Sequence, residues 1–297
     1  MNILLEQMLS HADPSQVPGL ARFFKTGPGQ YGEGDKFLGI KVPVTRAIVK
    51  ECWRKVGTPW DGKGGASWDG RSGSFDFPEL EECICSEYHE VRLAALLTLV
   101  EIFKHSKRSL DFARDDKVGH FDQVPPLSFR PSEARDLSFR PSEVPPLSFR
   151  PSEARGEICI DFYLSHTQFI NNWDLVDLSC YPLLGEWLLD SPDRSLLYNL
   201  ARNGRTIWEQ RIGIVSTMTF IRHGQLDDTF AIADILLHHP HDLIHKAVGW
   251  LLREAGKRNK PALEAYLAPR YAVMPRTMLR YAIEKFPEVE RQRYLAR

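Results

Sequence analysis

The sequence predicts an all-α protein that is built as a solenoid of antiparallel helix pairs. Apolar residues recur at spacings of three and four through most of the chain, which is typical of amphipathic helices, and no segment reads as a convincing strand. Glycine, proline and aspartate interrupt this pattern at the expected turns. Helices joined by short turns pack antiparallel and can stack into an extended array. The 297 residues, 43% of them hydrophobic, suffice for a core, and we expect a single domain over residues 1–297.

The N-terminal part begins with two short expected helices, at residues 1–9 and 18–24. Residues 25–35 follow and contain four glycines and a proline, so they form a loop with special backbone angles. This loop lacks the spacing and the Lys-Ser/Thr pair of a phosphate-binding P-loop. Another helix is expected over residues 43–55, because proline is favoured in the first helical turn.

A helix pair is expected at residues 78–87 and 89–105. Residues 91–100 are apolar on nearly every side, which predicts that the second helix of the pair is buried. The later expected helices span residues 157–165, 173–189, 193–203, 206–222, 227–238, 242–257, 261–271 and 275–286, with a last one near residue 288.

Two segments interrupt the helical pattern. Residues 57–77 hold two similar Trp-Asp-Gly motifs and read as a glycine-rich surface loop. Between about residues 115 and 156, the heptad Leu-Ser-Phe-Arg-Pro-Ser-Glu occurs three times at a ten-residue period. Proline excludes this insertion from helix interiors and it has no apolar periodicity, so we expect a disordered excursion rich in Pro, Ser and Arg. A binding arm that presents Phe and Arg is the alternative.

Composition narrows the class of protein. Neither a secretory signal nor a run of about 18 apolar residues is visible, so we expect no membrane span. The five scattered cysteines favour a reducing cytoplasm over a disulfide framework or a zinc site. The histidines within residues 238–241 have no Cys or carboxylate at ligand spacing, so no metal and no cofactor are expected.

The charge is unevenly distributed along the chain. Residues 201–297 hold sixteen Lys or Arg residues and ten Asp or Glu residues, whereas residues 1–200 hold 22 and 29. A basic half can mark a surface that binds phosphate, and an unevenly charged solvated surface is the alternative.

A candidate site begins at Trp173. On a helix, Trp173 and Asp177 are one turn apart and share a face, whereas Asp174 points elsewhere. An aromatic face beside a carboxylate suits a flat, positively charged group. The alternative for Asp177 is a carboxylate stabilised by the start of the helix, which is also our interpretation of Asp174.

A second candidate surface surrounds Trp250. Lys246, Arg253 and Lys257 share its helix face at spacings of four, three and seven. Tryptophan among cations suits a surface that meets phosphates and a base, and a partly buried tryptophan with solvated neighbours is the alternative.

Four motifs in order resemble the AlkD-type DNA alkylation repair glycosylases. They are Phe37-Leu38-Gly39-Ile40 with Pro43, Asn172-Trp173-Asp174 with Asp177, Trp208 with Gln210-Arg211, and Lys246-Ala247 with Gly249-Trp250 and Arg253-Glu254. The resemblance covers nearly the whole chain outside the two interruptions. It implies a HEAT-like solenoid whose concave, basic face cradles double-stranded DNA, and an activity that excises 3-methyladenine and 7-methylguanine.

The resemblance also implies roles for individual residues. Asp177 matches the catalytic carboxylate, and Trp173 and Trp250 match the aromatic residues that contact the deoxyribose of the lesion. Arg211 matches an arginine on the DNA backbone, with pairing to Glu209 or another neighbour as the alternative. Trp208 is interpreted as core. The further candidates for DNA contact are Lys41, Lys246, Arg253, Lys257 and Arg258.

The chemistry agrees with these roles. Alkylation at N3 or N7 makes a purine cationic, so the base leaves without protonation and one carboxylate suffices to stabilise the sugar cation and to position water. The resemblance implies that the lesion is not inserted into a deep pocket. We expect a monomeric, nucleoid-associated cytoplasmic enzyme. The alternatives are a relative that binds DNA structures without excision and a protein-binding helical scaffold.

Overall fold

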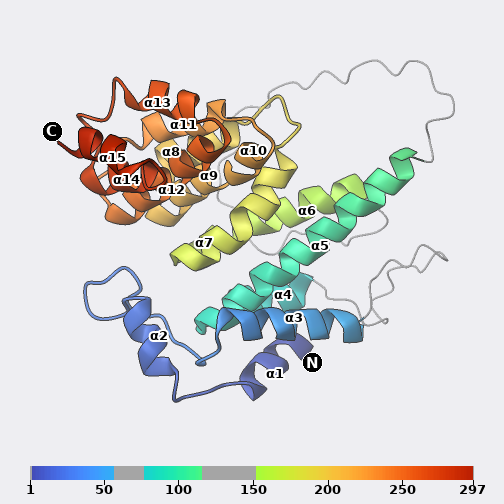
Figure 1. The fold of residues 1–297 in the computed structure, drawn as a ribbon. Coiled ribbons are helices and arrows are strands. Elements are labelled where there is room, and N and C mark those ends of the chain that lie inside the picture. Colours follow the sequence, from blue (N-terminus) through green and yellow to red (C-terminus); the bar gives the residue numbers. More distant parts are fainter. Residues whose placement is uncertain (1, 57–76, 116–151, 297) are drawn as a thin grey trace.

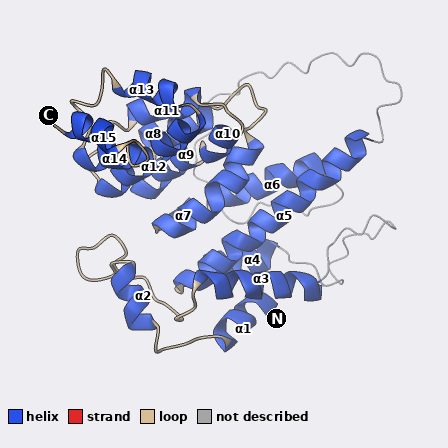
Figure 2. Ribbon diagram, in the orientation of Figure 1, coloured by secondary structure: helices blue, strands red, loops and turns tan. Residues whose placement is uncertain are grey.

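The computed structural model describes the chain over residues 2–56, 77–115 and 152–296 (Figure 1). The glycine-rich loop expected at 57–77 and the repeat insertion expected at about 115–156 lie almost entirely outside the described residues. Within the described residues, helices are the only regular elements besides one isolated bridge between Lys36 and Tyr88 (Figure 2). The predicted all-α fold class is confirmed.

Helices follow one another through both halves of the chain. The N-terminal half contains α1 (Ile3–Ser10), α2 (Val17–Phe23), α3 (Val42–Val56), α4 (Phe77–Ile84), α5 (His89–Asp115) and α6 (Ser152–Ser165). The C-terminal half contains η1 (Thr167–Phe169), α7 (Trp173–Cys180), η2 (Tyr181–Gly185), α8 (Ser195–Asn203), α9 (Ile207–Val215), α10 (Met218–Arg222), α11 (Asp227–Ile235), α12 (Asp242–Arg258), α13 (Lys260–Leu267), α14 (Arg276–Ala282) and α15 (Glu288–Leu295).

The helices form two layers of a solenoid. In the first layer, α3, α5, α7, α9, α12 and α14 each contact the next, so this layer runs from one end of the molecule to the other. The second layer consists of α4, α6, α8, α11 and α13, each of which packs on a helix of the first layer. The array therefore places α7, α9 and α12 side by side, although their sequences lie far apart.

The core lies between the two layers. Residues 91–100 of α5 are all buried, as their predominantly apolar character predicts. Gly249 lets α14 approach α12, since a Cβ at this position would lie 2.5 Å from both the Met278 carbonyl oxygen and the Tyr281 Cβ. The close approach of α14 to α12 thus lies beside Trp250.

Two expected long helices are interrupted. The helix predicted over 173–189 is α-helical to Cys180, continues through the π-helical turn η2, which contains Pro182, and is α-helical again at residues 186–187. Proline cannot donate the i→i−4 hydrogen bond, so the backbone widens there. The helix predicted over 206–222 divides into α9 and α10, where the hydroxyls of Ser216 and Thr217 donate back to the carbonyls of Ile212 and Ile214.

Two predicted boundaries near the insertion were also wrong. Helix α5 extends to Asp115 and not to residue 105, and α6 begins at Ser152 and not at residue 157. The third copy of the repeated heptad therefore ends within the first turn of α6.

The Phe-Leu-Gly-Ile motif has a structural explanation. The buried Glu90 carboxylate accepts hydrogen bonds from the backbone N–H groups of Leu38, Gly39 and Ile40, at 2.9, 2.9 and 3.1 Å. Gly39 has a φ of +88°, and a Cβ there would lie 1.9 Å from the Asp13 carbonyl oxygen. The motif fixes the chain just before α3 and so holds exposed Lys41 at the start of that helix.

Candidate functional site

Asp177 and Arg211 form a two-pronged ion pair between α7 and α9. Arg211 donates from Nε to Oδ1 at 2.8 Å and from Nη2 to Oδ2 at 2.7 Å. Its Nη1 donates to the Leu243 carbonyl at the start of α12, at 2.6 Å. Arg211 is buried, whereas the Asp177 side chain is 15% exposed. The Arg211 guanidinium therefore links α7, α9 and α12 by hydrogen bonds and orients the Asp177 carboxylate at the surface.

Opposing effects act on the pKa of the Asp177 carboxyl. Burial raises the pKa of the Asp177 carboxyl above its usual 3.8, and the charge of Arg211 opposes that rise, while nearby Asp174 adds to it. A bidentate guanidinium favours the ionised carboxylate and fixes its orientation. The site thus presents a poorly hydrated anion whose charge is compensated on one side only.

Trp173 lies one turn before Asp177 and is held by aromatic neighbours. Its ring centroid is 5.6 Å from that of Phe24 and 5.7 Å from that of Phe23, which is 61% exposed. The side chain of Asn172 accepts from the Trp173 N–H at 2.9 Å and caps α7. The cap fixes where the helix begins, and with it the face that Trp173 and Asp177 share.

Asp174 belongs to a separate, buried network. Its Oδ2 lies 2.9 Å from Nε2 of His89, whose Nδ1 lies 3.2 Å from Asp35. Burial alone would lower the pKa of His89, but its hydrogen bonds to Asp174 and Asp35 raise it to about 9. Arg92 and Asn171 also donate to Asp35, at 2.6 and 2.7 Å. Asp174 lies in the first turn of α7, as predicted, and is also paired with His89 in the core.

Trp250 lies in a depression between α10 and α12. The lining residues, from α10 and α12, are Met218, Ile221, Arg222, Trp250, Glu254, Lys257 and Arg258. The guanidinium of Arg222 lies 4.6 Å from the ring centroid of Tyr181, which is one turn after Asp177. Arg222 therefore belongs both to the depression around Trp250 and to a cation–π contact with Tyr181 of η2. Arg222 was missed by sequence reasoning, since its ring partner is distant in sequence.

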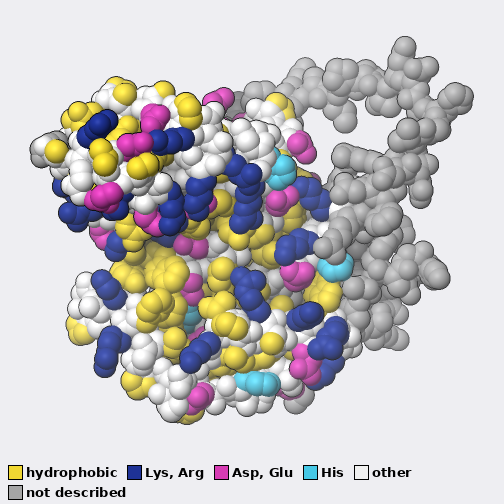
Figure 3. Space-filling view, viewed as in Figure 1, with side chains coloured by type: hydrophobic (Ala, Val, Ile, Leu, Met, Phe, Trp, Pro, Cys, Tyr) yellow, Lys and Arg dark blue, Asp and Glu magenta, His cyan; other side chains and the backbone are white. Residues whose placement is uncertain are grey.

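The predicted basic residues differ in how freely they face solvent. Lys246 pairs with Asp242 at 2.7 Å and Lys257 pairs with Glu254 at 2.7 Å, both within α12. These two pairings follow helical spacing and could have been recognised from the sequence. Lys and Arg side chains gather along the edge of the C-terminal helices, above a band of hydrophobic side chains (Figure 3).

Arg253 is held in ion pairs, whereas Arg258 faces solvent. Arg253 is turned toward Glu254 and toward Glu284, which follows α14. Arg258 is exposed beside Trp250, and no ion pair to it is found in the described part of the chain. Of the cations predicted around Trp250, Lys257 and Arg258 share its depression, whereas Lys246 lies toward the other end of α12.

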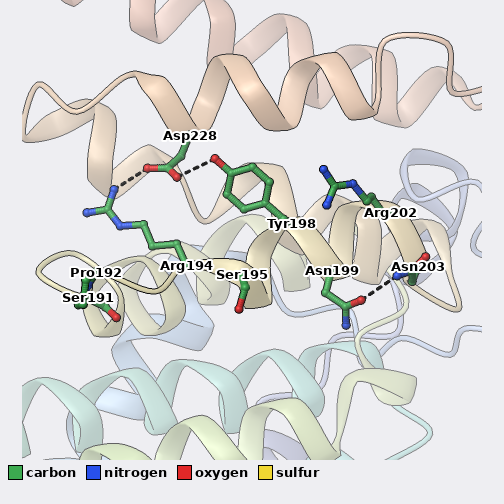
Figure 4. A pocket seen from close by; sticks show the side chains of 9 residues that line it. All are labelled: Ser191, Pro192, Arg194, Ser195, Tyr198, Asn199, Arg202, Asn203 and Asp228. Carbon is green, nitrogen blue, oxygen red and sulfur yellow. Dashed lines mark hydrogen bonds and ion pairs between the residues drawn. The ribbon is translucent and has the colours of Figure 1, made fainter. Parts of the chain in front are cut away.

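A larger depression of about 700 Å³ lies on α8, in the second layer (Figure 4). Arg194 in this depression donates to Asp228, and the Tyr198 hydroxyl donates to the other carboxylate oxygen at 2.9 Å. These polar groups satisfy one another, and none of the predicted site residues lines this depression.

The two histidines just before α12, His239 and His241, each accept a backbone hydrogen bond at Nδ1. The Nδ1 atoms of His239 and His241 accept backbone N–H groups of His241 and Leu243, at 3.0 and 3.1 Å. Burial lowers the pKa of both imidazoles. Among the described residues, no group of three or more His, Cys, Asp or Glu is placed to hold a metal ion. No helix in the described ranges is long and apolar enough to cross a membrane.

The fold and the site together define an α-helical repeat protein with an anion, two indoles and a cationic helix on its first layer. Comparison with known families gives the more particular assignment: residues 4–118 and 147–286 match the family described as DNA alkylation repair enzyme. The chain belongs to this family, and membership implies that it binds DNA.

A solved structure has the same fold. It is described as a predicted DNA alkylation repair enzyme from Enterococcus faecalis, and it is similar over 93% of this chain and 97% of its own length. The TM-score is 0.57 and the sequence identity is 14%, so this likeness concerns the fold alone. A comparison with curated proteins gave no significant match.

Proposed function

We propose that the protein is a DNA N-glycosylase that excises cationic N3- and N7-alkylated purines, such as 3-methyladenine and 7-methylguanine, from duplex DNA. The observation that carries the proposal is the Asp177 carboxylate, held in a fixed orientation by Arg211 and partly open to the surface one turn from Trp173. Membership of the DNA alkylation repair family supports alkylated DNA as the substrate class.

The reaction is hydrolysis of the N-glycosidic bond. The C1′–N9 bond breaks with its electron pair going to the purine, which neutralises the charged base. The deoxyribose then carries positive charge, which Asp177 stabilises across a site with little water. The oxygen of a water molecule bonds to C1′, and its proton passes through Asp177 to solvent.

The tryptophans stabilise the same charge. An indole face attracts a cation by roughly 0.5–2 kcal/mol. Trp173 shares a helix face with Asp177 and is restrained by Phe24, so it loses little freedom when a sugar docks. Trp250 serves as the second aromatic wall, with Lys257 and Arg258 beside it for phosphates. The lesion reacts at the surface and is not inserted into a deep pocket.

Arg211 acts first as a positioning residue in this proposal. Three of its N–H groups already have acceptors, on Asp177 and Leu243. Contact with the DNA backbone, as the sequence predicts, needs an N–H group that is still free or a change of partner. Orienting Asp177 needs no free N–H group and no change of partner.

A non-catalytic DNA-binding relative is the second candidate function. Such a protein would use the cationic residues of α12 without needing Asp177 to be held open beside Trp173. A protein-binding scaffold is the third, and the cations around Trp250 disfavour it. We further propose that the enzyme acts as a monomer on nucleoid DNA in the cytoplasm and requires no cofactor.

One assay separates these functions. Alkylated duplex DNA is incubated with the wild type and with Asp177→Asn, and released 3-methyladenine and 7-methylguanine are measured. The proposal expects release by the wild type and strong loss in the variant. No release by the wild type would exclude the glycosylase, and salt-sensitive DNA binding without release would favour the second candidate. Equal release by both proteins would exclude the role of Asp177.

A further inference from the structure

Arg222 is an exposed arginine that lies over an aromatic ring. It is the last residue of α10, and its guanidinium carbon lies 4.6 Å from the ring centroid of Tyr181 in η2. Over residues 2–56, 77–115 and 152–296, no hydrogen bond or ion pair of this guanidinium is found. A ring therefore covers one face of the guanidinium, while its N–H groups are available to a ligand.

Two other arginines that lie over rings differ from Arg222 in one respect. Arg194 lies 4.0 Å from the centroid of a phenylalanine ring, and Arg270 lies 4.4 Å from that of a tyrosine ring. The first also pairs with Asp228 at 2.5 Å, and the second pairs with Asp234 at 2.6 Å. Arg222 has the ring without a carboxylate partner in the described chain, so its donors can serve an anion from outside the protein.

Close packing fixes the position of Arg222 relative to η2. Thr219, one turn earlier on α10, donates from its hydroxyl to the Tyr181 carbonyl at 2.8 Å. Gly185 of η2 allows this approach, because a Cβ there would lie 2.5 Å from the Ser216 carbonyl oxygen. Since η2 directly follows α7, the helix of the proposed catalytic carboxylate, the guanidinium has a defined place relative to that helix.

Arg222 lines the same depression as Trp250 and Arg258. This depression has a volume of about 430 Å³ and lies between α10 and α12. Three cations and a single carboxylate line it. The carboxylate, Glu254, is already paired with Lys257 at 2.7 Å. The two arginines, one from each helix, are therefore the cations of the depression that have no anionic partner in the described ranges.

We propose that Arg222 holds a backbone phosphate of a DNA strand seated in this depression, and that Arg258 contacts the same strand from α12. A guanidinium donates two parallel hydrogen bonds to phosphate oxygens, and a ring against its flat face leaves those donors unobstructed. The indole of Trp250 lies in the same depression and offers an apolar face to the sugar of that strand. The inference rests on the proposed function and deepens it, since it adds a residue that positions the strand.

A phosphate contact of this kind fixes the register of the strand and does not enter the chemical step. Loss of the contact is therefore expected to weaken binding, while the excision rate at saturating enzyme stays close to that of the wild type. Arg222→Gln removes the charge. Arg222→Lys keeps the charge but loses the planar pair of donors, so the two variants separate a paired contact from general attraction to DNA.

The test uses a duplex that contains a tetrahydrofuran abasic analogue, which binds but is not cleaved. Dissociation constants are measured over a series of salt concentrations for the wild type and both variants. The matched control is Arg202→Gln, since Arg202 is exposed in the last turn of α8 and lies 5.9 Å from the ring centroid of Tyr198, but in the second layer (Figure 4). Single-turnover excision of 7-methylguanine is measured for each protein.

We expect Arg222→Gln to bind roughly tenfold more weakly, as for loss of hydrogen bonds to a charged group, and to reduce the salt slope by about one. Arg222→Lys is expected to bind more weakly than the wild type with an unchanged salt slope. The control Arg202→Gln should match the wild type in affinity and in salt slope.

Several results would overturn the inference and leave the glycosylase standing. They are wild-type binding by Arg222→Gln, equal weakening by Arg202→Gln, and a loss confined to the excision rate at saturation. Wild-type affinity of Arg222→Lys would show that charge alone acts, and would overturn the paired contact. An effect of Arg222→Gln on binding, without excision by the wild type, would exclude the glycosylase and retain the phosphate contact.

Discussion

The Asp177 carboxylate and the Arg211 guanidinium meet edge to edge, so that each carboxylate oxygen accepts one N–H, at 2.8 and 2.7 Å. The pair is at once the centre of the proposed site and a connection between α7 and α9. Substitutions at these two positions therefore affect both chemistry and stability, and the two effects can be measured separately.

Asp177→Asn is expected to lose most of the excision rate and much stability. Removing a preorganised charge from a site of this kind costs about 3–4 kcal/mol in the barrier, or more than a hundredfold in rate. The variant also leaves buried Arg211 without its counter-charge, which costs roughly 3–5 kcal/mol in the free energy of unfolding. Single-turnover kinetics and urea unfolding measure the two losses. Exposed Asp190→Asn is the control and should match the wild type in both.

Arg211→Lys distinguishes positioning from contact with the DNA backbone. Lysine keeps the positive charge but cannot donate to both carboxylate oxygens in a fixed plane. If Arg211 orients Asp177, the excision rate at saturation falls, by about tenfold or more, while affinity for the abasic duplex is retained. A weaker affinity at an unchanged rate would instead assign Arg211 to the phosphates, as the sequence predicts.

The His89 network makes stability depend on pH in the alkaline range. The folded-state pKa of His89, about 9, is above the unfolded value of 6.5, so its contribution is complete below pH 6.5 and is lost as pH rises toward 9. The difference corresponds to about 3 kcal/mol. Urea unfolding at pH 6, 7.5 and 9 should show this loss in the wild type and not in His89→Gln. Parallel pH curves for the two proteins would contradict the assignment.

His241 gives the opposite dependence on pH. Its neutral Nδ1 caps α12 by accepting from the Leu243 N–H at 3.1 Å, and burial lowers its pKa. Stability from this cap is complete above pH 6.5 and is lost as pH falls toward the lower folded-state pKa. His241→Asn retains a capping oxygen that does not titrate, so its stability should exceed that of the wild type by about 1 kcal/mol at pH 5. Equal unfolding midpoints at pH 5 would contradict this.

The sequence predicted those features that depend on local spacing. The separation of Asp174 from Asp177 follows from the helical period alone, and the structure confirms that Asp174 is turned into the core toward His89. The burial of residues 91–100 and of Trp208 likewise follows from their apolar surroundings.

Features that depend on tertiary contacts were not predictable in this way. Arg211 and Asp177 are 34 residues apart, and only the stacking of α7 on α9 brings them together. His89 drew no attention in the sequence, because its two carboxylate partners lie on distant segments. The π-helical turn after Cys180 was foreseeable from Pro182, whereas the break at Ser216 depends on hydroxyls bonding back to the helix.

The hydrogen bonds of Arg211, which join α7, α9 and α12, also constrain which substitutions the sequence can accept during evolution. A lineage that abandoned excision by mutating Asp177 would inherit a buried guanidinium bonded only to the Leu243 carbonyl. We expect such a lineage to replace Arg211 first or at the same time, because the reverse order passes through an unstable intermediate. If Asp177 is the catalytic carboxylate, as proposed, loss of activity is a two-site event, and the scaffold itself delays the drift toward a protein that only binds DNA.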